Sequence, residues 1–254
     1  MSIQDDAQIT VSVISHGQAA WIGGLLEDLE RLATPVAVML TINRPEPLAD
    51  DLIQRAGVRC LHNPHPQGFG ANHNQAFRHC QTPWFGILNP DIRLPTDPFP
   101  GLLRAAPAGL GAIAPLMVAP DGAREDNARH FPTLPGLIRK ALGRDDGRVR
   151  LSGQSLQAVD WVGGMFLLTP AAAFSAVGGF DEGFHLYYED VDLCARLWGA
   201  GYRVELLTTE RVVHHAQRAS RRQLRPLGWH LRSATRYFLK HTGRLPRTAG
   251  AMHS

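Results

Sequence analysis

Residues 178–198 read GGFDEGFHLYYEDVDLCARLW, and this stretch places acidic side chains around the expected start of a helix. Asp181 and Glu182 follow two glycines, which permit a sharp turn of the backbone. Asp190 precedes an apolar run with helical spacing, so its side chain is expected on the helix face that points inward. The stretch therefore aims one carboxylate at the interior of the protein.

The neighbouring acids allow two interpretations. Asp192 lies four residues before Arg196, a spacing that predicts an ion pair on the outer surface of the helix. Glu189 and Asp190 either complement the helix dipole as first-turn acids or provide a half-buried carboxylate that serves as a general base. A second carboxylate, Asp91 in the triplet NPD, is expected at the same cleft and favours the general base.

Strands and helices are expected to alternate along the chain. Short β-branched or apolar runs predict strands over residues 9–15, 36–40, 58–62, 84–88, 109–120, 158–169, 202–207 and 212–216. Apolar residues at helical spacing predict helices over residues 21–32, 48–57, 69–80, 169–178, from 189 onward and from 220 onward. This alternation predicts an α/β fold with a mostly parallel sheet, in which ligands bind beyond the carboxyl ends of the strands.

Three polar segments follow expected strands at those carboxyl ends: SHG at 15–17, INRPE at 42–46 and NPD at 89–91. The segment GFG at 68–70 is not a dinucleotide-binding fingerprint, because it follows the third strand and lacks the third glycine. The long segment 119–157, rich in Pro, Gly, Arg and Asp, is expected to be a lid, a binding loop or a disordered segment, and acceptor choice is expected to lie there.

The composition is that of a globular enzyme. The chain has 254 residues, 44% of them hydrophobic and 19% charged, enough for one large α/β domain or two small ones. Its three cysteines, Cys60, Cys80 and Cys194, form no CxxC pair, so we predict no zinc ribbon or disulfide framework and a reducing cytosol. The start MSIQDDAQ does not resemble a signal peptide, and no apolar run reaches the roughly 18–20 residues of a membrane span.

The C-terminal part is basic. Residues 221–247 contain no acid, although the net charge of the whole chain is only +3. Trp229, Tyr237 and Phe238 alternate there with Arg and Lys, so this helix either contacts an anionic membrane or packs its aromatic side chains on the domain. Nucleic-acid binding is not expected, because no recognisable module accompanies the charge. The expected location is cytoplasmic, with any membrane contact peripheral and at the inner face.

Four segments, in this order, resemble the family-two inverting glycosyltransferases of the GT-A fold, in particular the rhamnosyltransferase-like branch. They are QGFGANHNQAF at 67–77, ILNPDIRL at 87–94, WVGGMFLLTPAAAFSAVGGFDEGFHLYYEDVDLCARLWGAGYRV at 161–204 and VVHHAQRAS at 212–220. The resemblance implies a single domain with a Rossmann-like, mostly parallel central sheet flanked by helices and a C-terminal amphipathic helix. Its parts would be a nucleotide-sugar-binding half at about 9–118, an acceptor and catalytic half at about 157–220, and a basic helix and tail at 221–254.

The resemblance also implies catalytic and acceptor-binding residues. Asp190, with Glu189 beside it, matches the catalytic base that deprotonates the acceptor hydroxyl during one inverting displacement. Asp181 and Glu182 would line the acceptor side. The floor under the sugar would be formed by Trp161, Gly163 and Gly164, although tight strand packing also explains the two glycines.

Asp91 stands where this family has its metal-binding acid, so it would hold a divalent cation, Mg²⁺ or Mn²⁺, against the donor diphosphate. His214 matches a histidine near the metal, whereas His215 is expected to be structural. Asn89 would lie beside the phosphates or ribose. The alternative is that the NPD triplet is only a strand-ending turn.

The remaining donor-binding candidates are Ser15, His16, Asn43 and Asn74. The family normally has an Asp-Asn pair at the end of the second strand, and this chain has Ile42 in place of the acid, so Asn43 would contact the base instead. The resemblance implies a nucleotide-sugar-dependent hexosyltransferase that moves a sugar, with rhamnose a candidate, to a saccharide or lipid-linked acceptor in bacterial surface polysaccharide synthesis. The alternative is a non-catalytic sugar- or partner-binding relative with a degraded donor site.

Overall fold

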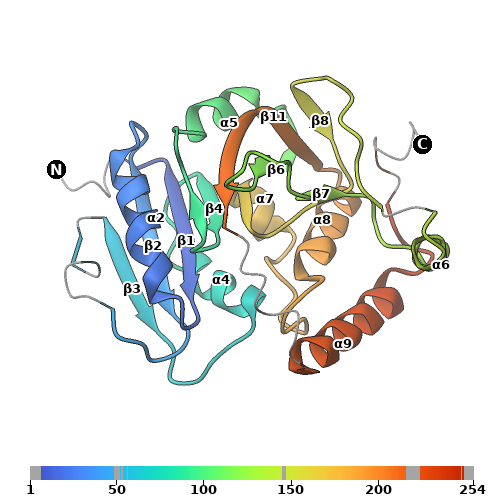
Figure 1. Cartoon of the computed structure of the whole chain (residues 1–254), viewed down its shortest axis with the longest axis horizontal. Helices are drawn as coiled ribbons and strands as arrows, with labels where there is room; N and C mark the ends of the chain where they lie inside the picture. The colour runs from blue at the N-terminus through green and yellow to red at the C-terminus, as the bar shows by residue number, and fades with distance from the viewer. Residues whose placement is uncertain are drawn as a thin grey trace.

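The computed structural model describes residues 7–48, 52, 54–55, 57–144, 147–215, 224–246 and 248. A twisted sheet runs through the molecule with helices on both sides (Figure 1). The helix expected over residues 48–57 lies largely outside the described residues. Within the described ranges, no helix combines the length and hydropathy needed to cross a bilayer.

The central sheet is mostly parallel, as predicted. Its strand order is β3-β2-β1-β4-β10-β6-β11-β5, with β8 paired to β11. One direction is shared by β1 (Ile9–Ser15), β2 (Val36–Ile42), β3 (Val58–His62), β4 (Trp84–Leu88), β6 (Leu110–Val118) and β11 (Arg203–His214). The opposite direction is taken by β5 (Ile92–Arg93), β8 (Leu156–Ala158) and β10 (Phe166–Pro170). Strands from both expected halves of the chain therefore belong to one sheet.

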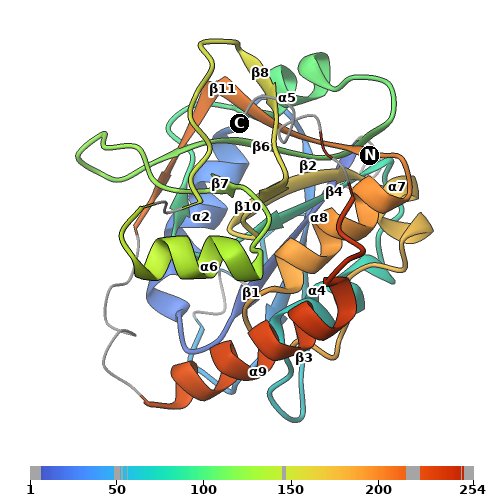
Figure 2. The ribbon, with the colours of Figure 1, turned by 90° about the vertical axis from the view of Figure 1, so that its right-hand side faces the viewer.

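Helices cover both faces of this sheet (Figures 1 and 2). One face packs on α2 (Ala19–Arg31) and α5 (Phe99–Ala105), and the other on α4 (Phe69–Phe77), α7 (Ala171–Ala176) and α8 (Glu189–Gly199). Because strand side chains alternate, Val11 and Val13 of β1 enter the first core. Ser12 points to the opposite face, where its hydroxyl bonds Nδ1 of the buried His73 of α4 at 2.8 Å.

The expected strand over residues 158–169 is divided in two. β9 (Trp161–Val162) pairs with β7 (Ala128–Arg129) in a separate two-stranded sheet, and β10 enters the central sheet. The break falls at Gly163 and Gly164, so the two glycines form a corner between the sheets. Residues 202–207 and 212–216 were expected as separate strands, but 203–207 and 212–214 belong to the single strand β11, which has a register shift between Leu207 and Arg211; residue 216 lies outside the described residues.

The segment 119–157 contains a helix that the sequence analysis did not predict, α6 (Leu134–Ala141). Thr133 caps its start, because the Thr133 hydroxyl accepts a hydrogen bond from the backbone N–H of Gly136 at 3.1 Å. The capping threonine and the proline that follows at Pro135 were the available sequence signals. Figure 2 shows α6 and α9 (Leu224–His241) at the same end of the molecule.

Helix α9 covers α8, and this changes the surroundings of Asp192. The predicted Asp192–Arg196 pair is confirmed at 2.8 Å, but its predicted exposure is wrong, because the Asp192 side chain is fully buried. Asp192 also accepts bonds from His241 Nε2 and Lys240 Nζ of α9, each at 2.7 Å. The bonds from His241 and Lys240 to Asp192 therefore attach the C-terminal helix to the rest of the domain.

The aromatic side chains of α9 do not all face solvent. Tyr237 is fully buried and Phe238 packs against the same core, as the packing alternative predicted. Trp229 remains partly exposed, with its ring 5.0 Å from that of His185.

Candidate active site

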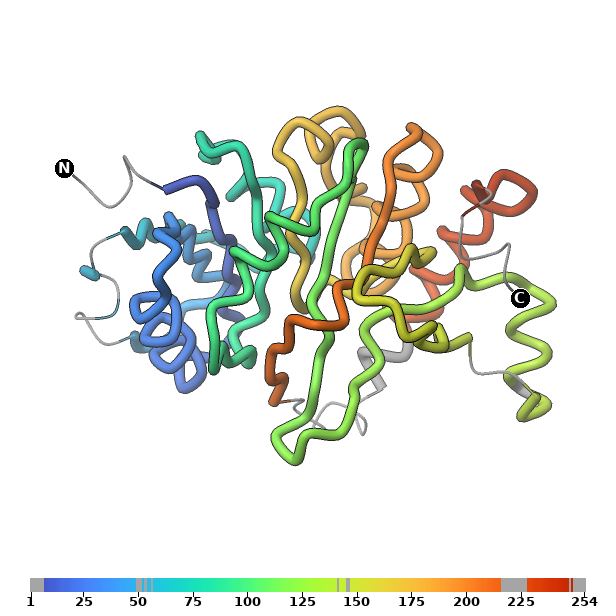
Figure 3. Tube along the Cα trace, turned by 90° about the horizontal axis from the view of Figure 1, so that it is seen from above, coloured from blue at the N-terminus to red at the C-terminus, as the bar shows by residue number. Residues whose placement is uncertain are grey.

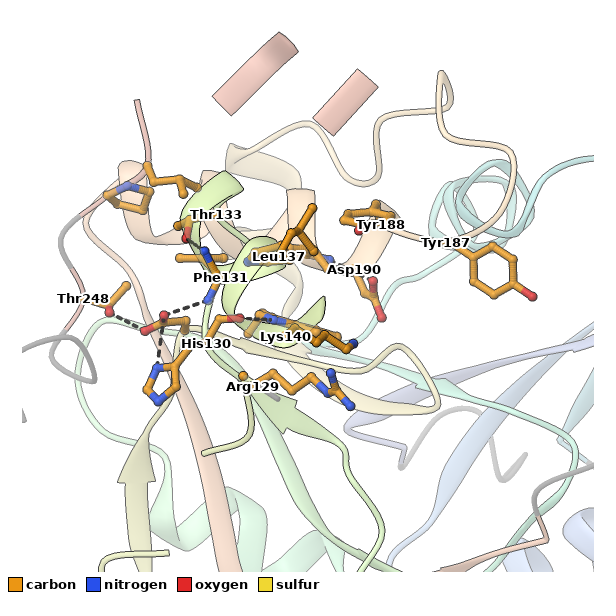
Figure 4. A pocket seen from close by; sticks show the side chains of 18 of the residues that line it. Arg129, His130, Phe131, Thr133, Leu137, Lys140, Tyr187, Tyr188, Asp190 and Thr248 are labelled. Carbon is orange, nitrogen blue, oxygen red and sulfur yellow. Dashed lines mark hydrogen bonds and ion pairs between the residues drawn. The ribbon is translucent and has the colours of Figure 1, made fainter. Parts of the chain in front are cut away.

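A cavity of about 610 Å³ lies between α6, the start of α8, β9 and α9. The residues labelled in Figure 4 show its two sides, with Tyr187, Tyr188 and Asp190 on one and Arg129 and Lys140 on the other. Much of the lining comes from residues 129–147, within the segment expected to select the acceptor.

Asp190 is held in place by two backbone groups. Its Oδ2 accepts a hydrogen bond from the Gly164 N–H at 3.1 Å, and its Oδ1 accepts one from the Val191 N–H at 2.8 Å. Burial raises the pKa of Asp190, while these two bonds favour the ionised form and oppose that rise. The arrangement presents a carboxylate with increased basicity to the cavity, as a general base requires.

Glu189 lies beside Asp190 but is more deeply buried. Its Oε2 is inaccessible and has no hydrogen-bond partner. Burial and the nearby Asp190 charge raise the pKa of Glu189 to about 8. The two acids therefore favour a single negative charge near neutral pH, and the backbone bonds to Asp190 place that charge on Asp190.

The chain reaches this pair through an unusual turn. Tyr187 and Tyr188 both have left-handed backbone conformations, with φ of 70° and 67°. Such conformations cost non-glycine residues about 1–2 kcal/mol each. They turn the chain directly before α8, so that Glu189 and Asp190 occupy the first turn of the helix beside the cavity.

One residue of the predicted sugar floor, Gly164, contacts Asp190 directly. A Cβ atom at Gly164 would lie 3.1 Å from the Phe69 ring, so glycine allows the close approach that the bond to Asp190 uses. Gly163 donates its N–H to Asn127 O at 2.9 Å. Trp161 lines the cavity, and its Nε1–H donates to His130 O at 3.0 Å. Contact of these residues with sugar stays a prediction.

On the donor side, Asp91 and His214 meet as the sequence predicted. His214 Nε2 lies 3.5 Å from Asp91 Oδ1, a buried oxygen that has no hydrogen-bond partner. His214 Nδ1 bonds Glu125 Oε2 at 2.5 Å. Burial lowers the pKa of His214, but the nearby Asp91 carboxylate and the hydrogen bond to Glu125 outweigh it and raise the pKa overall. The sequence analysis missed Glu125, because its segment carries no motif.

Asp91 and His214 offer a carboxylate oxygen and an imidazole nitrogen to a cation, and the unbonded Oδ1 of Asp91 fits such a role. Within the described part of the chain, no group of three or more His, Cys, Asp or Glu side chains is arranged to hold a metal. A cation here would therefore take further ligands from the donor diphosphate and water. Neither residue lines the cavity that contains Asp190.

The NPD triplet is also a turn. Asn89 O accepts a bond from the Ile92 N–H at 3.2 Å, which reverses the chain between β4 and β5. The Asn89 N–H donates to Met165 O at 2.8 Å, next to Gly164. The turn thus connects the Asp91 side of the site to the loop that holds Asp190.

Asn43 is almost completely buried at the end of β2, and its amide is fully bonded. Its Oδ1 accepts from the Gln67 N–H and from Asn63 Nδ2, and its Nδ2 donates to Gln67 O. The backbone partners fix the amide orientation, so Nδ2 also donates to Nδ1 of His16 at 2.9 Å. Neutral His16 therefore carries its proton on Nε2.

Burial and the nearby Arg44 charge lower the pKa of His16. Ser15 is buried, and its hydroxyl accepts a 3.4 Å bond from the Gln18 N–H at the start of α2. His16 thus lies on the surface, Asn43 donates a hydrogen bond to its ring, and Ser15 accepts a hydrogen bond from the start of α2. Sequence reasoning missed the buried Asn63 that completes the Asn43 network, and donor contact by these residues stays a prediction.

Three other predicted residues connect structural elements outside the cavity. Asn74 exchanges bonds with both the N–H and the C=O of Phe180 at 2.9 Å and donates to Glu182 at 3.0 Å. Asp181 pairs with Arg236 at 2.8 Å and Lys240 at 2.7 Å and so anchors α9. Acceptor contact by Asp181 and Glu182, and donor contact by Asn74, remain predictions without a supporting contact.

Comparison with known proteins identifies the family. Residues 13–162 match Glycosyl transferase family 2, and residues 149–218 match the N-terminal domain of galactosyltransferase. Rhamnosyltransferase WbbL of Escherichia coli (strain K12) is 29% identical over 246 residues, which cover 91% of this chain and 93% of WbbL. The N-acetylglucosaminyl-diphospho-decaprenol L-rhamnosyltransferase of Mycobacterium tuberculosis (strain ATCC 25618 / H37Rv) is 35% identical over 143 residues, 52% of this chain and 47% of that protein.

Solved structures agree on the fold. The mannosyltransferase PcManGT from Pyrobaculum calidifontis, in complex with GDP-Man and Mn²⁺, superposes with a TM-score of 0.63 at 14% identity, over 99% of this chain and 68% of that chain. GalNAc-T7 with UDP, GalNAc and Mn²⁺ also gives 0.63, at 12% identity over 84% of this chain and 44% of that chain. Since the family match covers more than half of the sequence, the chain belongs to glycosyl transferase family 2 and is a nucleotide-sugar-dependent glycosyltransferase of the GT-A fold.

Proposed function

We propose that this enzyme transfers a deoxyhexose, with rhamnose the leading candidate, from a nucleoside-diphosphate donor to a lipid-linked saccharide in bacterial surface polysaccharide synthesis. The similarity to two named rhamnosyltransferases supports the sugar, and the name of the mycobacterial relative includes a diphospho-decaprenol acceptor. The observation that carries the proposal is the Asp190 carboxylate, held at the cavity wall by the Gly164 and Val191 N–H groups.

In this mechanism Asp190 takes the proton of the acceptor hydroxyl. The oxygen forms its bond to the anomeric carbon while the bond from that carbon to the diphosphate oxygen breaks, and the electron pair leaves with the nucleoside diphosphate. Attack from the face opposite the diphosphate inverts the anomeric centre in one step. Glu189, protonated near neutral pH, keeps a second negative charge away from Asp190.

The Asp91–His214 pair would hold the divalent cation, Mg²⁺ or Mn²⁺. A bound cation would supply positive charge that stabilises the leaving diphosphate. Asp91 provides the oxygen without a hydrogen-bond partner, and Glu125 positions the His214 ring through its bond to Nδ1. The Mn²⁺ in the two structural relatives supports this assignment.

The basic side of the cavity supports an anionic acceptor. Arg129, Arg139 and Lys140 line the same space as Asp190, and Figure 4 shows the Arg129 and Lys140 side chains extending in a common direction. Arg and Lys side chains are the usual partners of phosphate oxygens. An acceptor with a diphosphate next to its sugar would place the anion there and the hydroxyl at Asp190.

The test is a thermal-shift panel of dTDP, UDP and GDP with and without Mn²⁺, followed by transfer assays with the matching nucleotide sugars. We expect one diphosphate to raise the melting temperature in a Mn²⁺-dependent way, because a ligand that binds only the folded state stabilises it. We then expect transfer from that donor to a lipid-diphosphate saccharide. Absence of binding by all three nucleotides would contradict the proposal, and transfer only to an uncharged saccharide would contradict its acceptor.

A further inference from the structure

Helix α6 exposes its apolar side chains instead of burying them. The exposed fractions are 51% for Leu134, 39% for Leu137, 62% for Ile138 and 63% for Leu142 just after the helix. Their spacing of three, four and eight residues from Leu134 puts them on one stripe of the helix. A stripe of this kind normally faces the core of a globular protein, and an exposed one indicates an interaction surface.

The charge on α6 itself is positive. Arg139 and Lys140 lie in its last turn, the exposed Arg144 follows, and the helix contains no acid, although Asp145 and Asp146 come directly after Arg144 in the sequence. Apolar residues beside Arg and Lys on one short helix are typical of segments that lie in the interface of an anionic bilayer. A second copy of the chain fits this surface poorly, because two α6 helices in contact would bring like charges together.

The C-terminal helix fits a bilayer less well than α6 does. Two of its three aromatic residues, Tyr237 and Phe238, pack into the domain. Its basic residues Arg236 and Lys240 are paired with Asp181. These four groups of α9 are therefore used inside the protein, whereas Trp229, Leu231, Arg232 and Leu239 of the same helix stay exposed.

The position of α6 would bring a bound membrane close to the cavity. Gly136, Leu137 and Lys140 of α6 line the cavity, and Asp190 lies on the wall contributed by α8. Figure 2 shows α6 on the outside of this end of the molecule, next to α9. A bilayer held against the apolar stripe would lie beside the cavity that receives the acceptor.

We propose that α6 docks the enzyme on an anionic phospholipid bilayer, with Leu134, Ile138 and Leu142 in the interface and the exposed Arg144, which does not line the cavity, at the headgroups. The binding needs no turnover and no donor, so it is separable from the proposed sugar transfer. In this proposal α6 makes most of the membrane contact, whereas α9 packs against α8 and stabilises the domain.

The experiment is sedimentation of the full chain with vesicles of phosphatidylcholine alone or with about 30% phosphatidylglycerol. The test variant is the double substitution Ile138→Glu and Leu142→Glu, since neither residue lines the cavity. The matched control is Leu239→Glu, an 83% exposed leucine on α9. Melting temperatures of all three proteins check the fold, and sedimentation velocity checks the oligomeric state.

We expect the wild-type chain and Leu239→Glu to bind the anionic vesicles alike, and the α6 variant to bind at least about tenfold more weakly. The proposal is overturned if the wild-type chain does not bind, if the α6 variant binds like wild type, or if Leu239→Glu loses as much binding. A change of oligomeric state in the α6 variant, with no vesicle binding by wild type, would identify a second copy as the partner instead.

Discussion

The backbone N–H of Gly164 donates a 3.1 Å hydrogen bond to Oδ2 of Asp190, 26 positions along the chain. The next residue, Met165, accepts a bond from the Asn89 N–H at 2.8 Å. One corner between two sheets thus connects the end of β4, where the metal candidate Asp91 lies, to the first turn of α8. These contacts link the NPD turn to the start of α8, although Asp91 itself does not line the cavity that contains Asp190.

Replacing Asp190 by Asn should abolish base catalysis. Asparagine keeps the shape of the side chain but cannot take the acceptor proton, so we expect kcat to fall by about 10²–10⁴. Donor binding, measured by thermal shift with the preferred nucleotide, should remain within a few-fold of wild type. Full activity of Asp190→Asn would show that another residue is the base.

Gly164→Ala tests the corner itself. The added Cβ would lie 3.1 Å from the Phe69 ring, so either the ring or the loop must move by a few tenths of an ångström, and we expect a shift of the loop that lengthens the bond to Asp190. A displacement of this kind should reduce kcat by about ten- to a hundredfold. The matched control is Gly228→Ala on α9, where a Cβ meets nothing within 4 Å. Equal activity of both variants would contradict the role of the corner.

The pH dependence of stability should report the buried Glu189. Its pKa is raised to about 8 in the folded protein from the ordinary glutamate value of 4.5, so between these values the folded state holds a proton that the unfolded state releases. This contribution to stability is present below about pH 4.5 and is lost as the pH rises to about 8. Urea unfolding from pH 5 to 9 should therefore show a steeper loss for wild type than for Glu189→Gln.

Removal of Asp91 should weaken metal-dependent nucleotide binding. We expect Asp91→Ala to lower the apparent Mn²⁺ affinity, titrated in the presence of the preferred nucleoside diphosphate. Glu125→Gln, which changes only the partner of His214, should lower it by about ten- to a hundredfold, as changes behind a metal ligand usually do. If both variants titrate with Mn²⁺ like the wild type, the assignment of the cation to Asp91 and His214 is wrong.

The attachment of α9 should depend strongly on Asp192. Burial alone would raise the pKa of Asp192, but its bonds to His241, Arg196 and Lys240 lower it overall, so the folded state holds the ionised acid. Asp192→Ala leaves these cations without their buried partner and should cost about 3–5 kcal/mol of unfolding free energy. Glu182→Ala, at an exposed residue, should cost less than about 1 kcal/mol.

Local sequence patterns predicted the sheet well. β1, β2 and β4 appear where β-branched and apolar runs were found, because such runs bury both faces of a parallel strand, and β3 forms the partly exposed edge strand at its predicted place. The corner at Gly163 and Gly164 was not predicted, since an apolar run does not show which sheet each half joins. Helix α6 was missed because its apolar stripe is interrupted by Pro135 and Gly136 and lies in a loop-like composition.

The candidate site, like the fold, was predictable only in part from the sequence. The sequence by itself determined the order of the elements, the acidic start of α8 and the family to which those motifs belong. Only the tertiary structure decided that Asp190 faces a cavity while Asp192, two residues later, is buried under α9. The physical reason is that helical spacing sets the direction of a side chain relative to its own helix, whereas burial and proton affinity depend on segments packed against it from far along the chain.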